Sequence, residues 1–568
     1  MGGGLMQLVA YGAQDVYLTG NPQITFWKVT YRRHTNFAVE SIEQTFNGQA
    51  DFGRRVTCTI SRNGDLAYRT YLQVTLPEIN QAMRNTTALP AVDPNQPLPG
   101  GATRSQAVYA RWLDFPGEQL IAQVEVEIGG QRIDRQYGDW MHIWNQLSLP
   151  AEQEKGYKAM TGQTTQLTYI TDPSFSDVDG PCTANGVRQV CEPRNALPET
   201  TLYVPFQFWY CRNPGLALPL IALQYHEVKI NLDLRPIDEC LWAVETLNAT
   251  AAGTNHRVTT AYAQSLVAAS LYVDYVFLDT DERRRMAQNP HEYLIEQLQF
   301  TGDESVGSSS NKIKLNFNHP CKELVWVVQP DSNVDYCSSL VCGNELFQLL
   351  GAQPWNYTDA HDALPNAYHA YGGPAGLASG DFIDASGIFD DAGAMDLSGG
   401  AIPGNNQNPG PTGALFSAHI SNWFSGQQPN FDSNVNAGVS DAGTFVLAET
   451  GLDLHCWGQN PVVVAKLQLN GQDRFSEREG TYFDLVQPYQ HHTRTPDTGI
   501  NVYSFALKPE EHQPSGSCNF SRIDNATLQL VLSNATVEGT NTAKVRVYAT
   551  NYNVLRVMSG MGGLAYSN

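Results

Sequence analysis

Long apolar runs are missing from this 568-residue sequence. Its most apolar stretches, LPLIAL at 218–223 and PVVVA at 461–465, have the length of buried strands. They fall well short of the roughly 18 apolar residues that a membrane-spanning helix requires. The opening MGGGLMQLVA lacks the charged start and long apolar core of a signal peptide, and Met6 stands where a myristoylation motif has Ser or Thr. We therefore expect a soluble protein that uses no signal peptide.

Charged residues are scarce, at 16 %, and most are acidic: 57 Asp and Glu against 35 Lys and Arg give a formal net charge of −22. Binding to phosphates needs a concentrated Lys/Arg surface, so this composition argues against nucleic acid as a direct partner. One basic cluster near the N-terminus contains Lys28, Arg32, Arg33 and His34. We interpret it as an ordinary strand edge; contact with anionic lipid or with an acidic neighbour is the alternative.

The ten cysteines form no C-x-x-C motif and no Cys/His spacing typical of a metal site. This pattern excludes the common zinc modules and predicts reduced thiols in a cytosolic compartment. Two pairs, Cys182 with Cys191 and Cys337 with Cys342, are close enough in sequence for a disulfide. Small buried thiols are the interpretation we favour for them.

The residues that are abundant are those of β-structure. Aromatic residues reach 10 %, with 26 Tyr and 22 Phe. Helical periodicity is confined to 140–162 and 281–294, whereas alternating apolar and polar residues recur throughout and predict strands. The alternating segments include 68–76, 123–130, 225–234, 270–279, 312–318, 462–471 and 527–532. The sequence therefore predicts an all-β protein.

The second half of the chain repeats the first in the same order. The matched pairs are VEIGGQRI (126–133) with LQLNGQDRF (467–475), LYVPFQF (202–208) with VYSFALK (502–508), 213–234 with 513–532, and YVDYVFLD (272–279) with YATNYNVLR (548–556). So long a period indicates a duplicated domain and excludes a solenoid. Each copy has about eight strand candidates, which favours a Greek-key sandwich or jelly roll. We expect IGGQ at 128–131 and LNGQ at 469–472 to form equivalent turns, and the seam to lie near 279–293.

Several long segments resemble the major capsid proteins of nucleocytoplasmic large DNA viruses, and are most similar to those of viruses that infect algae. The segments are 11–38, 60–66, 128–134, 213–230, 277–302, 469–475, 514–528 and 551–566, in the order of the family. The resemblance implies a double jelly roll: two tandem eight-stranded antiparallel β-sandwiches with long surface loop insertions and few short helices. We expect an N-terminal arm at 1–25, a first jelly roll at 26–283, and a second at 284–568.

The resemblance also implies a function and partners. The chain is expected to form homotrimers that act as pseudo-hexagonal capsomers and tile an icosahedral shell over an internal membrane. Its partners would be neighbouring capsomers, minor capsid and penton proteins, and the membrane on the inner side. It would be located in the virion and assembled in the host cytoplasm. The alternatives are a carbohydrate-active β-sandwich, suggested by the many Tyr and Trp residues, and a minor capsid or attachment paralogue.

Three insertions interrupt the predicted strands, at 80–117, 150–201 and 329–461. The third contains no Lys or Arg, so its carboxylates are least costly where water and counterions reach them. Its flanks are apolar strand candidates, so it should leave and return at one end of the second jelly roll. We predict that 329–461 forms an outward-facing tower, although 380–413 has the composition of a disordered linker.

We expect no catalytic, metal or cofactor site. Glu125 and Glu127 lie on one face of a strand and could form a glycosidase pair, but a solvated face is the simpler interpretation. The histidine clusters lack the spacing of a known site. They are His226 with Glu227, His361 with Asp362, and His491 with His492.

The sequence also contains standard acceptor sites for N-linked sugars, and we name Asn85, Asn248 and Asn356 as candidate glycosylation sites. Further acceptor sequences occur at Asn519, Asn525 and Asn534.

Overall fold

The structure is a computed structural model, and the residues that it describes fall into ten segments. They are 2–80, 83, 109–168, 171–173, 191–193, 197–244, 255, 257–341, 351–359 and 458–566.

The first half of the chain forms two four-stranded antiparallel sheets packed face to face. One sheet has the order β1 (Phe37–Gln44), β12 (Ala268–Leu278), β3 (Leu66–Leu76) and β9 (Thr200–Pro205). The other has the order β2 (Arg55–Thr59), β10 (Val228–Leu234), β5 (Ile121–Ile128) and β6 (Gln131–Tyr137). Alternate residues of β3 and β10 are buried, so each sheet turns one face to a shared core.

The second half repeats this arrangement. One sheet has the order β13 (His291–Phe300), β22 (Ala543–Met558), β16 (Pro320–Pro330) and β19 (Asn501–Ser504). The short strands β14 (Glu304–Val306), β20 (Cys518–Asn519) and β23 (Met561–Leu564) join it. The other sheet has the order β15 (Ser310–Leu315), β21 (Ala526–Leu532), β17 (Val462–Leu469) and β18 (Gln472–Glu479).

The two halves have the same topology. If the eight main strands of each half are counted along the chain, both halves show the orders 1-8-3-6 and 2-7-4-5. This is the strand order of a jelly roll, so the predicted fold of two eight-stranded antiparallel sandwiches is confirmed. Two short pairs lie outside these sheets: β4 (Tyr109–Trp112) with β11 (Leu241–Val244), and β7 (Thr171–Pro173) with β8 (Cys191–Pro193).

The predicted equivalence of the two Gly-containing turns is also confirmed. Gly129 and Gly130 join β5 to β6, and Asn470 with Gly471 joins β17 to β18. All four residues have positive φ, at 58°, 85°, 50° and 80°, as the two-residue type I′ hairpin requires. The other three matched pairs of segments likewise contain equivalent strands: β9 with β19, β10 with β21, and β12 with β22.

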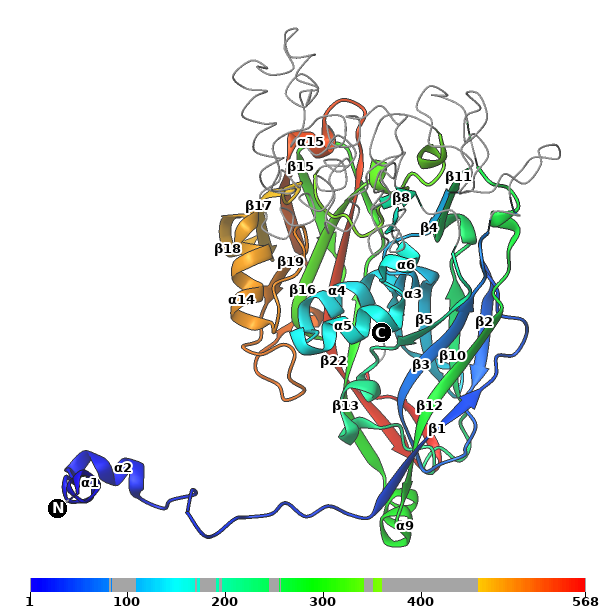
Figure 1. Cartoon of the computed structure of the whole chain (residues 1–568). Coiled ribbons are helices and arrows are strands. Elements are labelled where there is room, and N and C mark those ends of the chain that lie inside the picture. The colour runs from blue at the N-terminus through cyan, green and yellow to red at the C-terminus, as the bar shows by residue number, and fades with distance from the viewer. Residues whose placement is uncertain are drawn as a thin grey trace, which may run out of the picture.

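The helices connect strands along the chain, and the two that cover 138–161 lie between the two sandwiches (Figure 1). The predicted helix at 140–162 is two helices, α4 (Gly138–Ser148) and α5 (Ala151–Thr161), because the chain is extended at Leu149 and Pro150. The predicted helix at 281–294 corresponds to α9 (Thr280–Gln288), and the prediction that it extends to residue 294 is wrong. From His291 the chain pairs with β22 instead, after Pro290 has ended the helical run.

Along the chain, the three insertions connect main strands of the sandwiches. Residues 80–117 lie between β3 and β5 and include β4 and part of α3 (Pro116–Leu120). Residues 150–201 follow β6 and end with the first two residues of β9. Residues 329–461 begin with the last two residues of β16 and end directly before β17. Most of the last insertion, including 360–457, lies outside the described residues. No helix among the described residues is long and apolar enough to cross a membrane.

An N-terminal arm leaves the body of the protein near α9 (Figure 1). It contains α1 (Gly3–Val9), a short 3-10 turn and α2 (Val16–Thr19), and its described residues before β1 are exposed, except for the half-buried Asp15. Lys28, Arg32 and Arg33 belong to no strand, so the interpretation of this basic cluster as a strand edge is wrong. The first strand starts only at Phe37, and no strand among the described residues pairs with the basic segment.

Candidate functional site

The two jelly rolls meet along a seam built on α4. Residues of α4 at helical spacing, Trp140, Ile143, Trp144 and Leu147, are buried in a cluster shared by both halves. Facing them from the second jelly roll are side chains of β16, β19 and β22. The Trp140 ring lies 5.5 Å from the Tyr548 ring, measured between centroids. The first jelly roll therefore inserts a helix against the outer face of a sheet of the second.

The local sequence explains why α4 begins where it does. The helix starts at Gly138, directly after β6. A Cβ atom at this position would lie 2.2 Å from the carbonyl oxygen of Ile121, the first residue of β5, so only glycine allows this close approach. The spacing 140, 143, 144 and 147 then forms the apolar stripe that meets the second jelly roll.

Ion pairs flank this apolar contact. Asp139, next to the start of α4, binds Arg235 of its own jelly roll at 3.2 Å and Arg546 of β22 at 2.9 Å. Farther along, Glu154 of α5 binds Arg494 of the second jelly roll at 2.8 Å. Burial alone would lower the pKa of Arg546, but Asp139 and its other neighbours raise it overall. These pairs fix how the two sandwiches are oriented.

A second set of buried charges lies where β13 and β16 approach the first jelly roll. Glu296 of β13 binds Lys322 of β16 at 2.7 Å and Arg212 of α8 (Trp209–Arg212) at 3.1 Å. Burial would raise the pKa of Glu296, but its bonds to His512, Lys322 and Arg212 outweigh burial and bring the pKa to about 2. Glu296 is therefore held as a carboxylate that links the two halves.

Near these charges, His492 lies between two glutamates, an arrangement that the sequence did not reveal. Its Nε2 lies 2.9 Å from Glu323 and its Nδ1 lies 2.9 Å from Glu510. Burial alone would lower the pKa of His492, but the two carboxylates raise it to about 9. The imidazolium therefore bridges two acids that come from distant parts of the chain.

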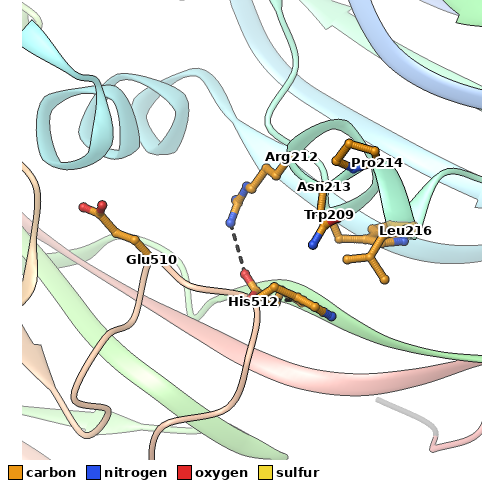
Figure 2. Close-up of a pocket in the computed structure, with 8 residues that line it drawn as sticks. Trp209, Arg212, Asn213, Pro214, Leu216, Glu510 and His512 are labelled. Carbon is orange, nitrogen blue, oxygen red and sulfur yellow. Dashed lines mark hydrogen bonds and ion pairs between the residues drawn. The ribbon is translucent and has the colours of Figure 1, made fainter. Parts of the chain in front are cut away.

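A cavity of about 360 Å³ opens beside these charges (Figure 2). Residues of the first jelly roll, including Trp209, Arg212 and Leu216, line it together with Glu296, Glu510 and His512 of the second. Arg212 and Glu296 are paired with each other, and Glu510 is paired with His492. Because these charges already compensate one another, the arrangement is suited to joining two domains.

Of the predicted carboxylate pair, Glu125 is buried and Glu127 is half-buried. Glu125 is 5 % exposed and is surrounded by Arg55 at 2.9 Å, Arg132 at 3.8 Å and Arg135. The interpretation of this residue as solvated is therefore wrong. The register explains why, because Arg135 of β6 lies directly opposite Glu125 of β5. Glu127 accepts a hydrogen bond from Asn231 at 3.3 Å.

The fold does not gather the candidate histidine clusters into one site. His226 contacts the second jelly roll, with its Nδ1 3.0 Å from the carbonyl oxygen of Gly562. His491 lies 3.0 Å from the carbonyl oxygen of Leu507. His361 and Asp362 lie outside the described residues. Among the residues that the structure covers, no group of three or more His, Cys, Asp or Glu side chains is placed to hold a metal ion.

Of the three candidate glycosylation sites, Asn85 and Asn248 lie outside the described residues. Asn356 is 1 % exposed, and its Oδ1 accepts hydrogen bonds from Thr358. In this folded chain its side chain is not open to solvent. The acceptor residues Asn519, Asn525 and Asn534 are exposed, and glycosylation of the chain stays a prediction.

The side chains of six cysteines are described, and none of these six forms a disulfide. They are Cys58, Cys211, Cys240, Cys321, Cys337 and Cys518. Burial raises the pKa of Cys58 to about 11 and that of Cys240 to about 12, so both are held as thiols. Of the two pairs considered for disulfides, Cys337 is free. Cys182, Cys342 and the side chain of Cys191 lie outside the described residues.

Comparison with known proteins covers almost the whole chain. Residues 25–279 match a family model described as major capsid protein N-terminus, and residues 282–563 match one described as large eukaryotic DNA virus major capsid protein. The chain is 74 % identical to the major capsid protein of Phaeocystis pouchetii virus over 569 residues, covering 100 % of both. It is 37 % identical to that of Paramecium bursaria Chlorella virus 1 over 592 residues, again covering 100 % of both.

Solved structures agree with these sequences. The quasi-atomic model of the PBCV-1 virus capsid matches with a TM-score of 0.56 and 32 % identity, covering 96 % of this chain and 100 % of that chain. The Faustovirus major capsid protein shares the fold, with a TM-score of 0.59, 14 % identity, and coverage of 96 % and 94 %.

The resemblance predicted from the sequence is thereby confirmed, and so is a location in the virion capsid. The chain folds into two jelly rolls of one topology that are joined where α4 packs on a sheet. Its matches to capsid proteins run from end to end. The chain belongs to the family of major capsid proteins of large eukaryotic DNA viruses.

Proposed function

We propose that three copies of the chain associate as a pseudo-hexagonal capsomer, and that these capsomers tile an icosahedral shell. The observation that best supports this is the pair of jelly rolls with one strand order, side by side in a single chain (Figure 1). Three such chains present six similar sandwiches, which suit a six-sided footprint. Head-to-tail contacts can close such a ring and bury surface that a monomer exposes. The role is structural, without catalysis.

The N-terminal arm supports contacts on the inner side of the shell. Phe26 and Trp27 are 100 % and 92 % exposed, and the basic Lys28, Arg32 and Arg33 follow them. Exposed apolar and basic side chains that are close in sequence favour a partner that offers both an apolar and an acidic surface. An internal membrane, a minor capsid protein or a penton protein beneath neighbouring capsomers meets that description; direct contact with nucleic acid is not part of the proposal.

The insertion at 329–461 is proposed to form the outward tower. Both of its described flanks are near α15 (Asn534–Val537): Pro330 pairs with Ala543, and Val462 pairs with Leu532. The insertion therefore leaves and returns at one end of the second jelly roll. Figure 1 shows α15 at the end opposite α9 and the arm, so an inward arm leaves the insertion facing outward.

Limited proteolysis of intact particles tests this placement. Cleavage confined to 329–461, with the shell remaining whole, is the expected result. Protection in particles, followed by cleavage only after disassembly, would place the insertion inside the shell or between capsomers.

The free thiols of the described residues support assembly in the reducing host cytoplasm. The trimer itself is tested by light scattering of the purified protein. We expect a mass of about 188 kDa, three times 62.6 kDa, and six-sided particles by negative-stain microscopy. A monomer that hydrolyses glycans would overturn the proposal.

A further inference from the structure

The second jelly roll contains a helix equivalent to α4. Residues 480–491 are helical without a break and include the π-turn η10 (Tyr482–Val486) and α14 (Gln487–His491). This helix follows β18 directly, as α4 follows β6. A Cβ atom at Gly480 would lie 1.8 Å from the carbonyl oxygen of Val462, the first residue of β17, just as Gly138 abuts Ile121. The two helices therefore occupy the same place in the two jelly rolls, 342 positions apart.

The inner faces of the two helices are used in the same way. Met141 of α4 is buried in the core of the first jelly roll, and Phe483, 342 positions later, is buried in the core of the second. Next to them, His142 and Asp484 are both buried polar residues at the matching position. Each helix thus packs on its own sandwich through equivalent residues.

The outer faces differ. Ile143, Trp144 and Leu147 of α4 are buried under the second jelly roll, and the matching residues of the later helix are Leu485, Val486 and Tyr489. These three are 52 %, 39 % and 83 % exposed. The same apolar stripe is therefore covered in one jelly roll and bare in the other, and a bare apolar stripe of this kind marks an interaction surface.

The surface that covers α4 also has an equivalent. α4 packs on the outer face of the sheet β13-β22-β16-β19, where Tyr548 of β22 pairs with Val325 of β16 and both are buried. In the first jelly roll the matching strands are β12 and β3, and the matching pair is Tyr272 with Tyr71. These two are only half-buried.

The outer face around this second pair is rich in tyrosine. The ring centroids of Tyr71 and Tyr272 are 5.4 Å apart, and Tyr203 of β9 lies 6.2 Å from Tyr71. Tyr203 is 39 % exposed. Tyrosine is enriched at protein interfaces because it offers apolar area together with a hydroxyl that tolerates water before association.

We propose that η10 and α14 of one copy pack on the tyrosine-rich face of β3, β9 and β12 in the next copy. The contact repeats, between chains, the seam that α4 makes within the chain. Figure 1 shows α14 on one flank of the molecule and β3 and β12 on the other, so one chain cannot bring its own two surfaces together. The inference rests on the proposed function and names the faces that close its ring by heterologous contacts.

The test is the mass of charge-bearing variants of the full chain, measured by light scattering. Leu485→Asp with Tyr489→Asp is expected to convert a particle of about 188 kDa, three times 62.6 kDa, into a folded monomer of 62.6 kDa. The circular dichroism spectrum of this variant should match that of the parent, because the changed side chains are exposed in the single chain and their replacement leaves its fold intact. The matched control is Val463→Asp, a 47 % exposed apolar position of β17 on the other sheet of the same jelly roll, which should leave the trimer intact.

The opposite face is tested independently by Tyr272→Asp, which should also give a monomer. A mixture of the two variants retains one intact helix face and one intact sheet face, so it should form a 1:1 pair of about 125 kDa, twice 62.6 kDa, and nothing larger. Variants that stay trimeric would overturn the inference while leaving the proposed function standing. A parent protein that is itself monomeric would contradict both.

Discussion

The two jelly rolls have one topology, but their equivalent sheets meet different surroundings. In β16 of the second jelly roll, residues 321–330 are all buried, because one face meets its own core and the other meets α4. In the equivalent β3 of the first, buried and half-buried residues alternate from Thr70 to Leu76. The sequences differ accordingly: ELVWVV at 323–328 is nearly continuous in apolar residues, whereas YLQVTL at 71–76 alternates. A strand's pattern thus reports how many of its faces are covered in the single chain.

The largest difference in the free energy of unfolding should appear between variants that break a charge pair in the seam and variants that break one on the exposed surface. Replacing Glu296 by Ala removes the carboxylate that lies 2.7 Å from the Lys322 ammonium, and leaves the charge of this fully buried lysine without that partner. We expect a loss of about 3–5 kcal/mol in the free energy of unfolding. Removing the exposed pair Lys229–Glu227 should cost no more than about 1 kcal/mol. Urea unfolding measures both, and equal losses would show that the seam does not desolvate its charges.

The covered and bare helices give a matched pair of substitutions. Leu147→Ala removes a buried side chain of α4 and should cost about 2–5 kcal/mol. Tyr489→Ala, at the equivalent place in α14, should change the stability of the monomer by no more than about 0.5 kcal/mol, because the side chain is exposed. Urea unfolding of the dissociated protein compares them. A large loss for Tyr489→Ala would mean that a part of the same chain covers α14.

The acid pair around His492 predicts a pH dependence in the second jelly roll. Because the pKa of His492 is about 9 in the folded chain, above its ordinary value of 6.5, the stabilisation is complete below about pH 6.5. It is lost as pH rises through 9, and a shift of this size corresponds to about 3 kcal/mol at most. The urea midpoint should therefore fall between pH 6 and pH 9.5, and less so in His492→Gln. An equal fall in this variant would assign the effect to other groups.

The two glycines that start the helices should behave alike. In Gly138→Ala and Gly480→Ala the new Cβ meets a backbone carbonyl oxygen that cannot move without shifting a strand. We expect losses of about 1–3 kcal/mol in both variants, measured by thermal or urea unfolding. A loss at only one position would contradict the equivalence of the two helices.

Much of the fold was predictable because it depends on local patterns. Alternation identified the strands, and the turns at 128–131 and 469–472 identified the duplication, since a type I′ hairpin needs residues that accept positive φ. The helix at 480–491 is not predicted by the sequence pattern, because Pro488 near its C-terminal end is typical of a helix break. The interpretation of the basic cluster in the arm as a strand edge is wrong for a different reason. Whether a segment becomes an edge strand depends on pairing with another strand, and the sequence of that segment alone does not reveal such pairing.

The seam could not be predicted from the sequence. Glu296, Lys322 and Arg212 come from three distant segments, and His492 meets carboxylates 169 and 18 positions away. Likewise, the burial of Glu125 depends on its register against β6. Such contacts follow from how sheets are packed, and a pattern within one strand or helix does not specify them.

The most direct test of the account is a cryo-EM reconstruction of the purified oligomer. We predict six sandwiches in one ring, with α14 of each copy on β3 and β12 of the next, so that seams within and between chains alternate. A ring in which α14 faces solvent, or a two-fold dimer joined through identical faces, would contradict it.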